Sequence, residues 1–304
     1  MTPAAVPAAA PAAAPALATV AAPSPLMLLR SAAYIVFLLA TLVPWALVAV
    51  LVSVFVRGGP MYWLCVGWLR LAVWGAKALC GVRYRVSGLE YLPTAADANA
   101  AVLLAPKHQS TWETFAFPAI MPHPLAYVFK RELLWIPFFG WAIGRMDMIH
   151  IDRSQRARAW AKVLAQGKRL MSHGNWVIMF PEGTRIDRGE AGQYQTGAAR
   201  LAITTGTPIV PIAVTSARCW PRRSWLLRPG LIEVSIGRPI PVKGRRHDEL
   251  MAEVASWIEA EMRRLDPAAY PDVSPHTPPG AWPDGQSAGA AQAPQASAAA
   301  AQRS

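Results

Sequence analysis

Residues 31–56 form a continuous run without a single charged side chain. As a helix, this run would extend about 39 Å, which exceeds the roughly 30 Å hydrocarbon thickness of a bilayer. A cleaved signal peptide fits less well, because the run is long, its basic flank is Arg30 alone and no Ala-x-Ala site follows. The run therefore predicts a helix that anchors the chain in a membrane.

A second apolar stretch, residues 61–80, contains Arg70, Lys77 and three tryptophans. This composition is typical of a helix that lies in the membrane interface or packs against the first helix, and it leaves open whether the stretch spans the bilayer. The basic residues that follow the first run are Arg57, Arg70, Lys77, Arg83 and Arg85. Because positive charge is enriched on the cytoplasmic side, we expect the rest of the chain on the cytoplasmic face of the inner membrane.

The charge balance narrows the class of binding partner. The chain has 30 Lys and Arg residues against 18 Asp and Glu residues, a formal charge of +12, which suits nucleic acid, anionic lipid or a phosphorylated substrate. We expect no nucleic acid, because the basic residues occur in scattered pairs without a recognisable nucleic-acid module. The 13 tryptophans instead suit a membrane–water interface. The three cysteines are far apart, which argues against a disulfide framework or a structural zinc site.

Composition divides the chain into four parts. Residues 1–26 are almost entirely Ala and Pro, and residues 269–304 are rich in Pro, Ala, Gly and Ser, so we expect both ends to be disordered. Residues 27–84 hold the membrane-anchoring helices, and residues 85–268 have the pattern of an α/β domain. The apolar runs that predict strands are residues 101–105, 126–129, 148–151, 176–180, 209–214 and 232–236. Helical patterns alternate with them, which predicts a mainly parallel sheet covered by helices.

The first group of candidate catalytic residues is Lys107-His108-Gln109-Ser110-Thr111-Trp112-Glu113, directly after a predicted strand. α/β folds present reactive groups where a strand ends and a helix begins. If Glu113 holds one ring nitrogen of His108, the other nitrogen can take a proton from a hydroxyl. Ser110 and Glu113 also fit a capping box, in which Glu113 only accepts a backbone N–H, and spacing alone does not decide between the two interpretations.

The second group is Phe180-Pro181-Glu182-Gly183-Thr184-Arg185, which again follows an apolar strand. Glycine allows a close backbone approach at this position, and the Arg185 guanidinium could bind a phosphate through two parallel hydrogen bonds. Taken alone, the group is equally compatible with an ordinary turn that carries a solvated arginine.

Four blocks occur in a fixed order: His108-x4-Glu113, Lys130-Arg131-Glu132-Leu133 with Ile151-Asp152-Arg153, the Phe180–Arg185 group, and Val210-Pro211-Ile212-Ala213. Together they resemble the 1-acyl-sn-glycerol-3-phosphate acyltransferase family over residues 85–245. The resemblance implies a glycerolipid acyltransferase-like α/β domain over residues 85–268, behind an N-terminal membrane-anchoring segment. It also implies that His108 is the general base and that Glu113 orients it. The residues that it implies in substrate binding are Arg185, Glu182, Gly183, Thr184, Lys130, Arg131 and Arg153.

The activity implied by the resemblance is transfer of a fatty acyl group from acyl-CoA or acyl carrier protein to the sn-2 hydroxyl of 1-acyl-sn-glycerol-3-phosphate. The product would be phosphatidic acid, in phospholipid biosynthesis. Most of the family has Asp where this chain has Glu113, so another lysophospholipid or an ornithine lipid stays open as the acceptor. An alternative from another class of function is a membrane protein that binds lipid without catalysing a reaction. We expect no metal and no cofactor, because the phosphate-loop, dinucleotide-binding and zinc-protease motifs are absent from the sequence.

Overall fold

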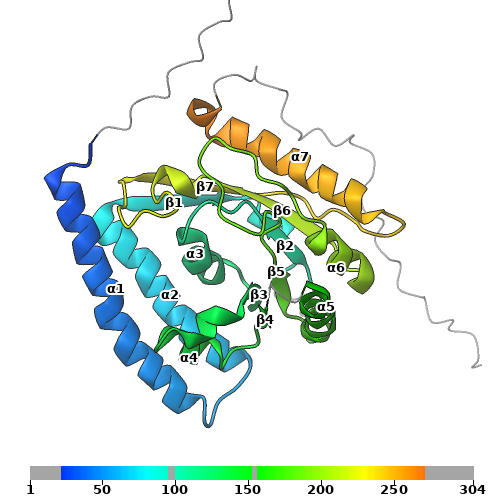
Figure 1. The fold of residues 1–304 in the computed structure, drawn as a ribbon, viewed down its shortest axis with the longest axis horizontal. Coiled ribbons are helices and arrows are strands. Elements are labelled where there is room, and N and C mark those ends of the chain that lie inside the picture. Colours follow the sequence, from blue (N-terminus) through cyan, green and yellow to red (C-terminus); the bar gives the residue numbers. More distant parts are fainter. Residues whose placement is uncertain (1–21, 95–99, 153–155, 271–304) are drawn as a thin grey trace, which may run out of the picture.

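The computed structural model describes residues 22–94, 100–152 and 156–270, which form an α/β fold built on one sheet (Figure 1). Within these residues the sheet has seven strands, in the spatial order β1-β7-β6-β2-β5-β3-β4. The strands are β1 (Val82–Ser87), β2 (Leu103–Pro106), β3 (Leu125–Lys130), β4 (Ile149–Ile151), β5 (Trp176–Ile178), β6 (Ile209–Val214) and β7 (Gly230–Ile236). All neighbouring pairs are parallel except β6 and β7. The predicted mainly parallel sheet is confirmed.

The central strands are apolar throughout because both faces of the sheet are covered. Every residue of β2 and β6 is buried, and Leu103 pairs with Ile209 on one side and with Val177 on the other. Strands buried on both faces read as continuous hydrophobic runs in the sequence. All six predicted strands are therefore present, and their ends differ from the prediction by no more than two residues.

β1 is not among the predicted strands. It lies at the edge of the sheet beside β7, and most of its residues are exposed, so its sequence lacks an apolar run. The domain boundary predicted after residue 84 falls inside this strand. The preceding helix ends at Cys80, because Gly81 adopts a left-handed conformation (φ 71°) that closes the helix.

The two N-terminal helices, α1 (Pro25–Val52) and α2 (Gly59–Cys80), lie side by side at one flank of the domain (Figure 1). Gly67 and Gly75 of α2 leave room for the rings of Trp45 and Phe37, which would clash with a Cβ at either position. The Trp45 indole N–H also donates to the Leu64 carbonyl at 3.0 Å. α2 thus packs against the first helix, one of the two arrangements predicted for it.

Both helices are long and apolar enough to cross a membrane, judged by length and composition. α1 begins at Pro25, slightly before the predicted residue 27, because the Ser24 side chain accepts the Met27 N–H at 3.2 Å and caps it. α2 is buried along much of its length, whereas α1 leaves a row of large apolar side chains exposed. These are Leu26, Leu28, Leu29, Val36, Leu39, Leu47, Val48 and Leu51.

Helices cover both faces of the sheet (Figure 1). α1, α2 and α3 (Trp112–Ile120) pack on one face, and α5 (Arg156–Ser172), α6 (Gly197–Thr205) and α7 (His247–Leu265) on the other. α7 illustrates the helical periodicity of apolar residues in the sequence, since its buried residues Leu250, Val254 and Ile258 recur at every fourth position. The shorter elements are α4 (Phe139–Ile143), η1 (Leu89–Tyr91), η2 (Arg131–Trp135), η3 (Ser216–Arg218) and η4 (Pro267–Ala269). Of the ends predicted to be disordered, 1–26 and 269–304, residues 1–21 and 271–304 lie outside the described residues. The prediction is wrong at the inner limits, because Pro25 and Leu26 belong to α1 and Ala269 belongs to η4.

Candidate active site

Three segments meet at one edge of the sheet. The loop after β2 carries His108, the loop after β5 carries Arg185, and β3 ends at Lys130. β2, β5 and β3 are adjacent parallel strands, so their carboxyl ends lie side by side. Ligands of open α/β sheets bind outside this edge. His108, Lys130 and Arg185 accordingly line one cavity although they are far apart in sequence.

The His108 and Glu113 side chains are in direct contact, with 2.5 Å between Nδ1 and Oε2. The Glu113 carboxylate is buried, whereas the His108 side chain is 13% exposed and lines the cavity. With a carboxylate at Nδ1, the neutral imidazole carries its proton there, which leaves the Nε2 lone pair for a substrate. The predicted pairing is therefore present in a geometry suited to general base catalysis.

The second carboxylate oxygen of Glu113 accepts hydrogen bonds from the backbone. Oε1 accepts the N–H groups of Gln109 and Ser110 at 2.8 and 2.9 Å, and it also accepts the hydroxyl of Ser216. The Ser110 hydroxyl does not return a bond to Glu113 and instead accepts the Trp112 N–H at 3.1 Å, so the reciprocal capping box is not formed. Of the capping-box interpretation only the backbone bond to Glu113 is present, and it is combined with the His108 contact, one on each carboxylate oxygen.

The main chain of His108 is held on both sides by the loop after β5. Its N–H donates to Glu182 Oε2 at 2.9 Å, and its carbonyl accepts the Ile186 N–H at 2.8 Å. The Phe180 ring stacks on the imidazole with 3.8 Å between ring centroids and 20° between their planes. The imidazole orientation is consequently restricted by the carboxylate, the backbone and an aromatic face together.

A buried charge cluster lies behind His108. Lys107 Nζ contacts Glu182 Oε1 at 2.7 Å and Glu259 Oε1 at 2.6 Å, and it also donates to the Glu190 carbonyl at 3.1 Å. The Lys107 and Glu182 side chains are fully buried. Burial raises the pKa of Glu182 above its ordinary value, although the Lys107 ammonium offsets part of that rise. Lys107 thereby ties the loops after β2 and β5 to α7, which carries Glu259.

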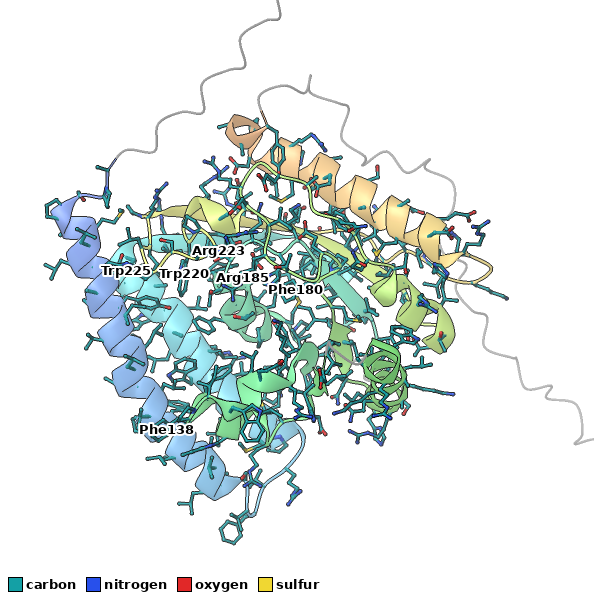
Figure 2. The ribbon with its side chains drawn as sticks, in the orientation of Figure 1. Phe138, Phe180, Arg185, Trp220, Arg223 and Trp225 are labelled. Carbon is teal, nitrogen blue, oxygen red and sulfur yellow. The ribbon has the colours of Figure 1, made fainter. Side chains whose placement is uncertain are left out.

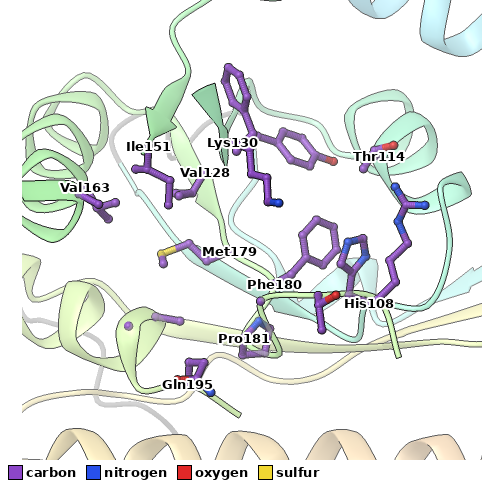
Figure 3. A pocket seen from close by; sticks show the side chains of 18 of the residues that line it. His108, Thr114, Val128, Lys130, Ile151, Val163, Met179, Phe180, Pro181 and Gln195 are labelled. Carbon is purple, nitrogen blue, oxygen red and sulfur yellow. The ribbon is translucent and has the colours of Figure 1, made fainter. Parts of the chain in front are cut away.

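The cavity in front of His108 has a volume of about 760 Å³. In Figure 3, the apolar side chains of Val128, Ile151, Val163 and Met179 gather at one end, and His108 and Phe180 lie toward the other. The cationic side chains in its lining are Lys130, Arg185, Arg222 and Arg223. No carboxylate side chain is found among the described residues of the lining. The cavity is therefore suited to a ligand that is apolar at one end and anionic at the other.

A family model described as Acyltransferase matches residues 83–215, which include His108, Glu113 and Arg185. A 1-acyl-sn-glycerol-3-phosphate acyltransferase of Pseudomonas aeruginosa is 40% identical over 203 residues, which cover 66% of this chain and 77% of that protein. The chain belongs to the 1-acyl-sn-glycerol-3-phosphate acyltransferase family. It is therefore an acyltransferase enzyme.

Two further relatives agree with this membership. The Escherichia coli protein called 1-acyl-sn-glycerol-3-phosphate acyltransferase is 32% identical over 179 residues, which cover 57% of this chain and 72% of that protein. The crystal structure of the 1-acyl-sn-glycerophosphate acyltransferase from Thermotoga maritima has a TM-score of 0.66 at 21% identity, covering 79% of this chain and 95% of that chain. The likeness to the Thermotoga maritima structure concerns the fold alone, which this acyltransferase shares.

The substrate-binding residues expected from the sequence fall into three groups. Those that line the cavity of the acyltransferase together with His108 are Lys130, Gly183, Thr184 and Arg185. Glu182 is buried behind the cavity and bonds to Lys107 and to the His108 backbone, so it holds the loop in place. Arg131 is exposed and is not part of the lining, and Arg153 lies outside the described residues.

Arg131 acts electrostatically on a different pair of side chains, His150 and Lys162. Lys162 Nζ and His150 Nε2 are 2.6 Å apart. The pKa of His150 is lowered, first by burial and then by the positive charges of Lys162 and Arg131. The positive charge of Arg131 thus acts on two side chains that are outside the described cavity lining.

Four residues at the site were given no role from the sequence: Lys107, Ser216, Arg222 and Arg223. Lys107 belongs to the first group of candidate catalytic residues, but nothing in its local pattern indicates that a charged side chain is fully buried there. Ser216 meets Glu113 across 103 positions of sequence, and no local signal marks such a contact. The adjacent pair Arg222 and Arg223 was visible only as one of several basic pairs.

Proposed function

We propose that this acyltransferase moves a fatty acyl group from a thioester to the free sn-2 hydroxyl of 1-acyl-sn-glycerol-3-phosphate, giving phosphatidic acid. The observation that carries the proposal is the His108–Glu113 pair at a cavity that is apolar at one end and has only cationic charge in its described lining. The names of the relatives from Pseudomonas aeruginosa and Escherichia coli support the same acceptor.

The proposed chemistry needs no nucleophile from the protein. His108 Nε2 takes the proton of the acceptor hydroxyl, whose oxygen attacks the thioester carbonyl carbon and forms a tetrahedral oxyanion. When this intermediate collapses, the carbon–sulfur bond breaks and the imidazolium returns its proton to the departing thiolate. Glu113 stabilises the transient imidazolium, because its Oε2 lies 2.5 Å from Nδ1.

We assign the acceptor's phosphate to the cationic side of the cavity. Arg185 has the guanidinium fork that matches a phosphate, and Lys130 adds a second positive charge in the same lining. Gly183 has φ 66°, so glycine lets the loop turn close to the ligand at this point. The apolar end, with Val163 and Met179, is suited to an acyl chain.

The same proposal includes the location of the enzyme. The exposed apolar row of α1 would lie in the inner membrane, with the α/β domain on the cytoplasmic face and its cavity supplied with lysolipid from the bilayer. Acyl-CoA and acyl carrier protein are the two donor forms proposed, and phospholipid biosynthesis is the pathway that the product would enter.

The direct test is an acylation assay on the purified full-length protein in detergent micelles. Lysophosphatidate, other lysophospholipids and lyso-ornithine lipid would each be offered with palmitoyl-CoA and with palmitoyl-acyl carrier protein, and products identified by mass spectrometry. We expect phosphatidic acid as the main product, and loss of it in His108→Ala but not in the matched control His173→Ala, whose ring lies in an exposed turn. Faster acylation of any other acceptor would contradict the proposed substrate.

A further inference from the structure

The segment between η3 and β7 connects α1 to the cavity. It folds on itself, since the Arg228 N–H donates to the Cys219 carbonyl at 2.7 Å and the Trp220 indole N–H to the Ser224 carbonyl at 2.8 Å. It also docks on α1, because the Leu227 N–H donates to the hydroxyl of Ser31 at 3.0 Å. The segment is therefore held at both ends, and its tip carries two adjacent arginines.

These two arginines have different surroundings. The Arg222 guanidinium donates to the Arg185 carbonyl and contacts Asp187 at 3.2 Å, so it braces the loop that carries Arg185. Arg223 also lines the cavity, but no hydrogen bond or ion pair holds its side chain among the residues that the structure describes. Figure 2 shows Arg223 near Arg185, on the same side of Phe180.

The backbone of Arg223 is unusual. Its φ is +59°, and within the described residues only Phe138 shares a positive φ among residues other than glycine. L side chains rarely adopt this conformation, and glycine would occupy it without strain. Strained residues of this kind cluster at ligand sites, where the surrounding structure holds them in place. Arginine at this point is explained if its guanidinium is needed in the cavity.

We infer that Arg223 is a second guanidinium ligand for the acceptor's phosphate, beside Arg185. A phosphate monoester carries nearly two negative charges at neutral pH and has three acceptor oxygens, so it can bind a further guanidinium besides Arg185 and Lys130. Arg223 supplies that guanidinium from the side of α1, where a lysolipid would arrive from the membrane. This inference rests on the proposed function and adds a headgroup-selecting residue from outside the four sequence blocks.

The test measures kcat and KM for lysophosphatidate and, separately, KM for the thioester donor that the wild-type enzyme accepts. Arg223→Gly is the decisive variant, because it removes the guanidinium while relieving the backbone strain. Arg223→Ala and Arg223→Lys complete the series, Arg185→Ala is the reference, and Arg228→Ala is the matched control, since Arg228 is in the same segment but outside the described cavity lining.

We expect the acceptor KM to rise about ten- to a hundredfold in Arg223→Gly and Arg223→Ala, as for the loss of one charge-assisted hydrogen bond. Arg223→Lys should be intermediate, the donor KM should stay within about twofold, and Arg223→Gly should melt no lower than wild type. If the wild-type enzyme acylates lysophosphatidate and Arg223→Gly leaves the KM for it unchanged, this inference is overturned and the proposed function is not. A rise in donor KM instead would assign Arg223 to the donor. A wild-type enzyme inactive on lysophosphatidate would overturn the proposed function as well.

Discussion

Glu113 connects the imidazole of His108 to the backbone of the loop that carries it. Oε2 contacts the ring, and Oε1 is bonded to two backbone N–H groups and to the Ser216 hydroxyl. A carboxylate held by three donors on one oxygen has little freedom to turn away from the ring on the other. The Glu113 side chain thus reaches the imidazole while staying fixed to the backbone.

This arrangement predicts that the charge of Glu113 is required for turnover, whereas the Ser110 hydroxyl contributes only to stability. In Glu113→Gln the amide oxygen can still accept the backbone N–H groups, but the charge that stabilises the imidazolium is lost. We expect kcat to fall about 100- to 10,000-fold with the fold retained. Ser110→Ala should keep its activity and lose about 1 kcal/mol of unfolding free energy, since only the Trp112 N–H loses its acceptor.

Turnover assays would measure kcat, and thermal melting would measure stability, for Glu113→Gln, Ser110→Ala and His108→Ala. His108→Ala should be as inactive as Glu113→Gln, because the two side chains act as one unit. If Glu113→Gln retains most of its activity, Glu113 serves the backbone only, and His108 must have another partner.

At the scale of elements, Lys107 joins three parts of the fold that are distant in sequence. It follows β2, and its ammonium contacts Glu182 from the loop after β5 and Glu259 from α7. Tyr194, which is in the same loop as Glu182, donates its hydroxyl to Glu259 at 2.7 Å, so this loop contacts α7 at a second point. Because Glu182 also binds the His108 N–H, the position of the imidazole depends on packing on the opposite face of the sheet.

We therefore predict that Lys107→Met destabilises the protein by about 3–5 kcal/mol, the usual cost of leaving a buried charge without its partner. Glu259→Gln should cost only about 1 kcal/mol, since Lys107 keeps Glu182 and the amide can still accept its hydrogen bond. The matched control is Lys168→Met, an exposed lysine on α5, which should change stability by less than about 0.5 kcal/mol.

The measurement is urea unfolding in detergent micelles, with the free energy taken from the midpoint and slope. Equal losses in Lys107→Met and Lys168→Met would show that the cluster contributes nothing to stability. In that case the position of His108 would not depend on α7.

At the scale of the whole molecule, one flank of the acyltransferase is apolar and exposed. The open face of α1 carries side chains such as Leu39, which is 59% exposed, and Leu47, which is 52% exposed. Contiguous apolar surface of this kind marks an interaction site, and its length and composition suit a bilayer. The segment that docks on α1 also lines the cavity, so we expect the site to lie close to the membrane.

The anchoring role of α1 can be tested without disturbing its packing. Leu39→Lys combined with Leu47→Lys places two charges on the exposed face, each of which costs about 2.5–3.5 kcal/mol near the centre of a bilayer. We expect the double variant to leave the membrane fraction after a carbonate wash, while wild type stays and needs detergent. Thr204→Lys, an exposed position on α6, is the control and should behave as wild type. Full retention of the double variant would mean that α1 is not the anchor.

The sequence by itself determined the elements and the chemical character of the site. Strands buried on both faces produce apolar runs, so β2 and β6 were recognisable from composition alone. The two blocks that carry His108 and Arg185 each follow such a run, and α/β folds present reactive groups where a strand ends. β1 was missed because an edge strand with most of its residues exposed carries no such run.

Only the tertiary structure decided which side chains meet. Spacing left two interpretations of Glu113, and in the fold one oxygen contacts the ring while the other binds the backbone and Ser216 without a reciprocal capping box. The partners of Lys107 lie 75 and 152 positions away, and Arg223 reaches the cavity through a segment that α1 holds in place. The spacing of apolar residues in one element indicates which of its faces is buried, whereas contacts between elements depend on the order of the strands in the sheet. That order results from how all the elements pack together, so no single segment of the chain contains it.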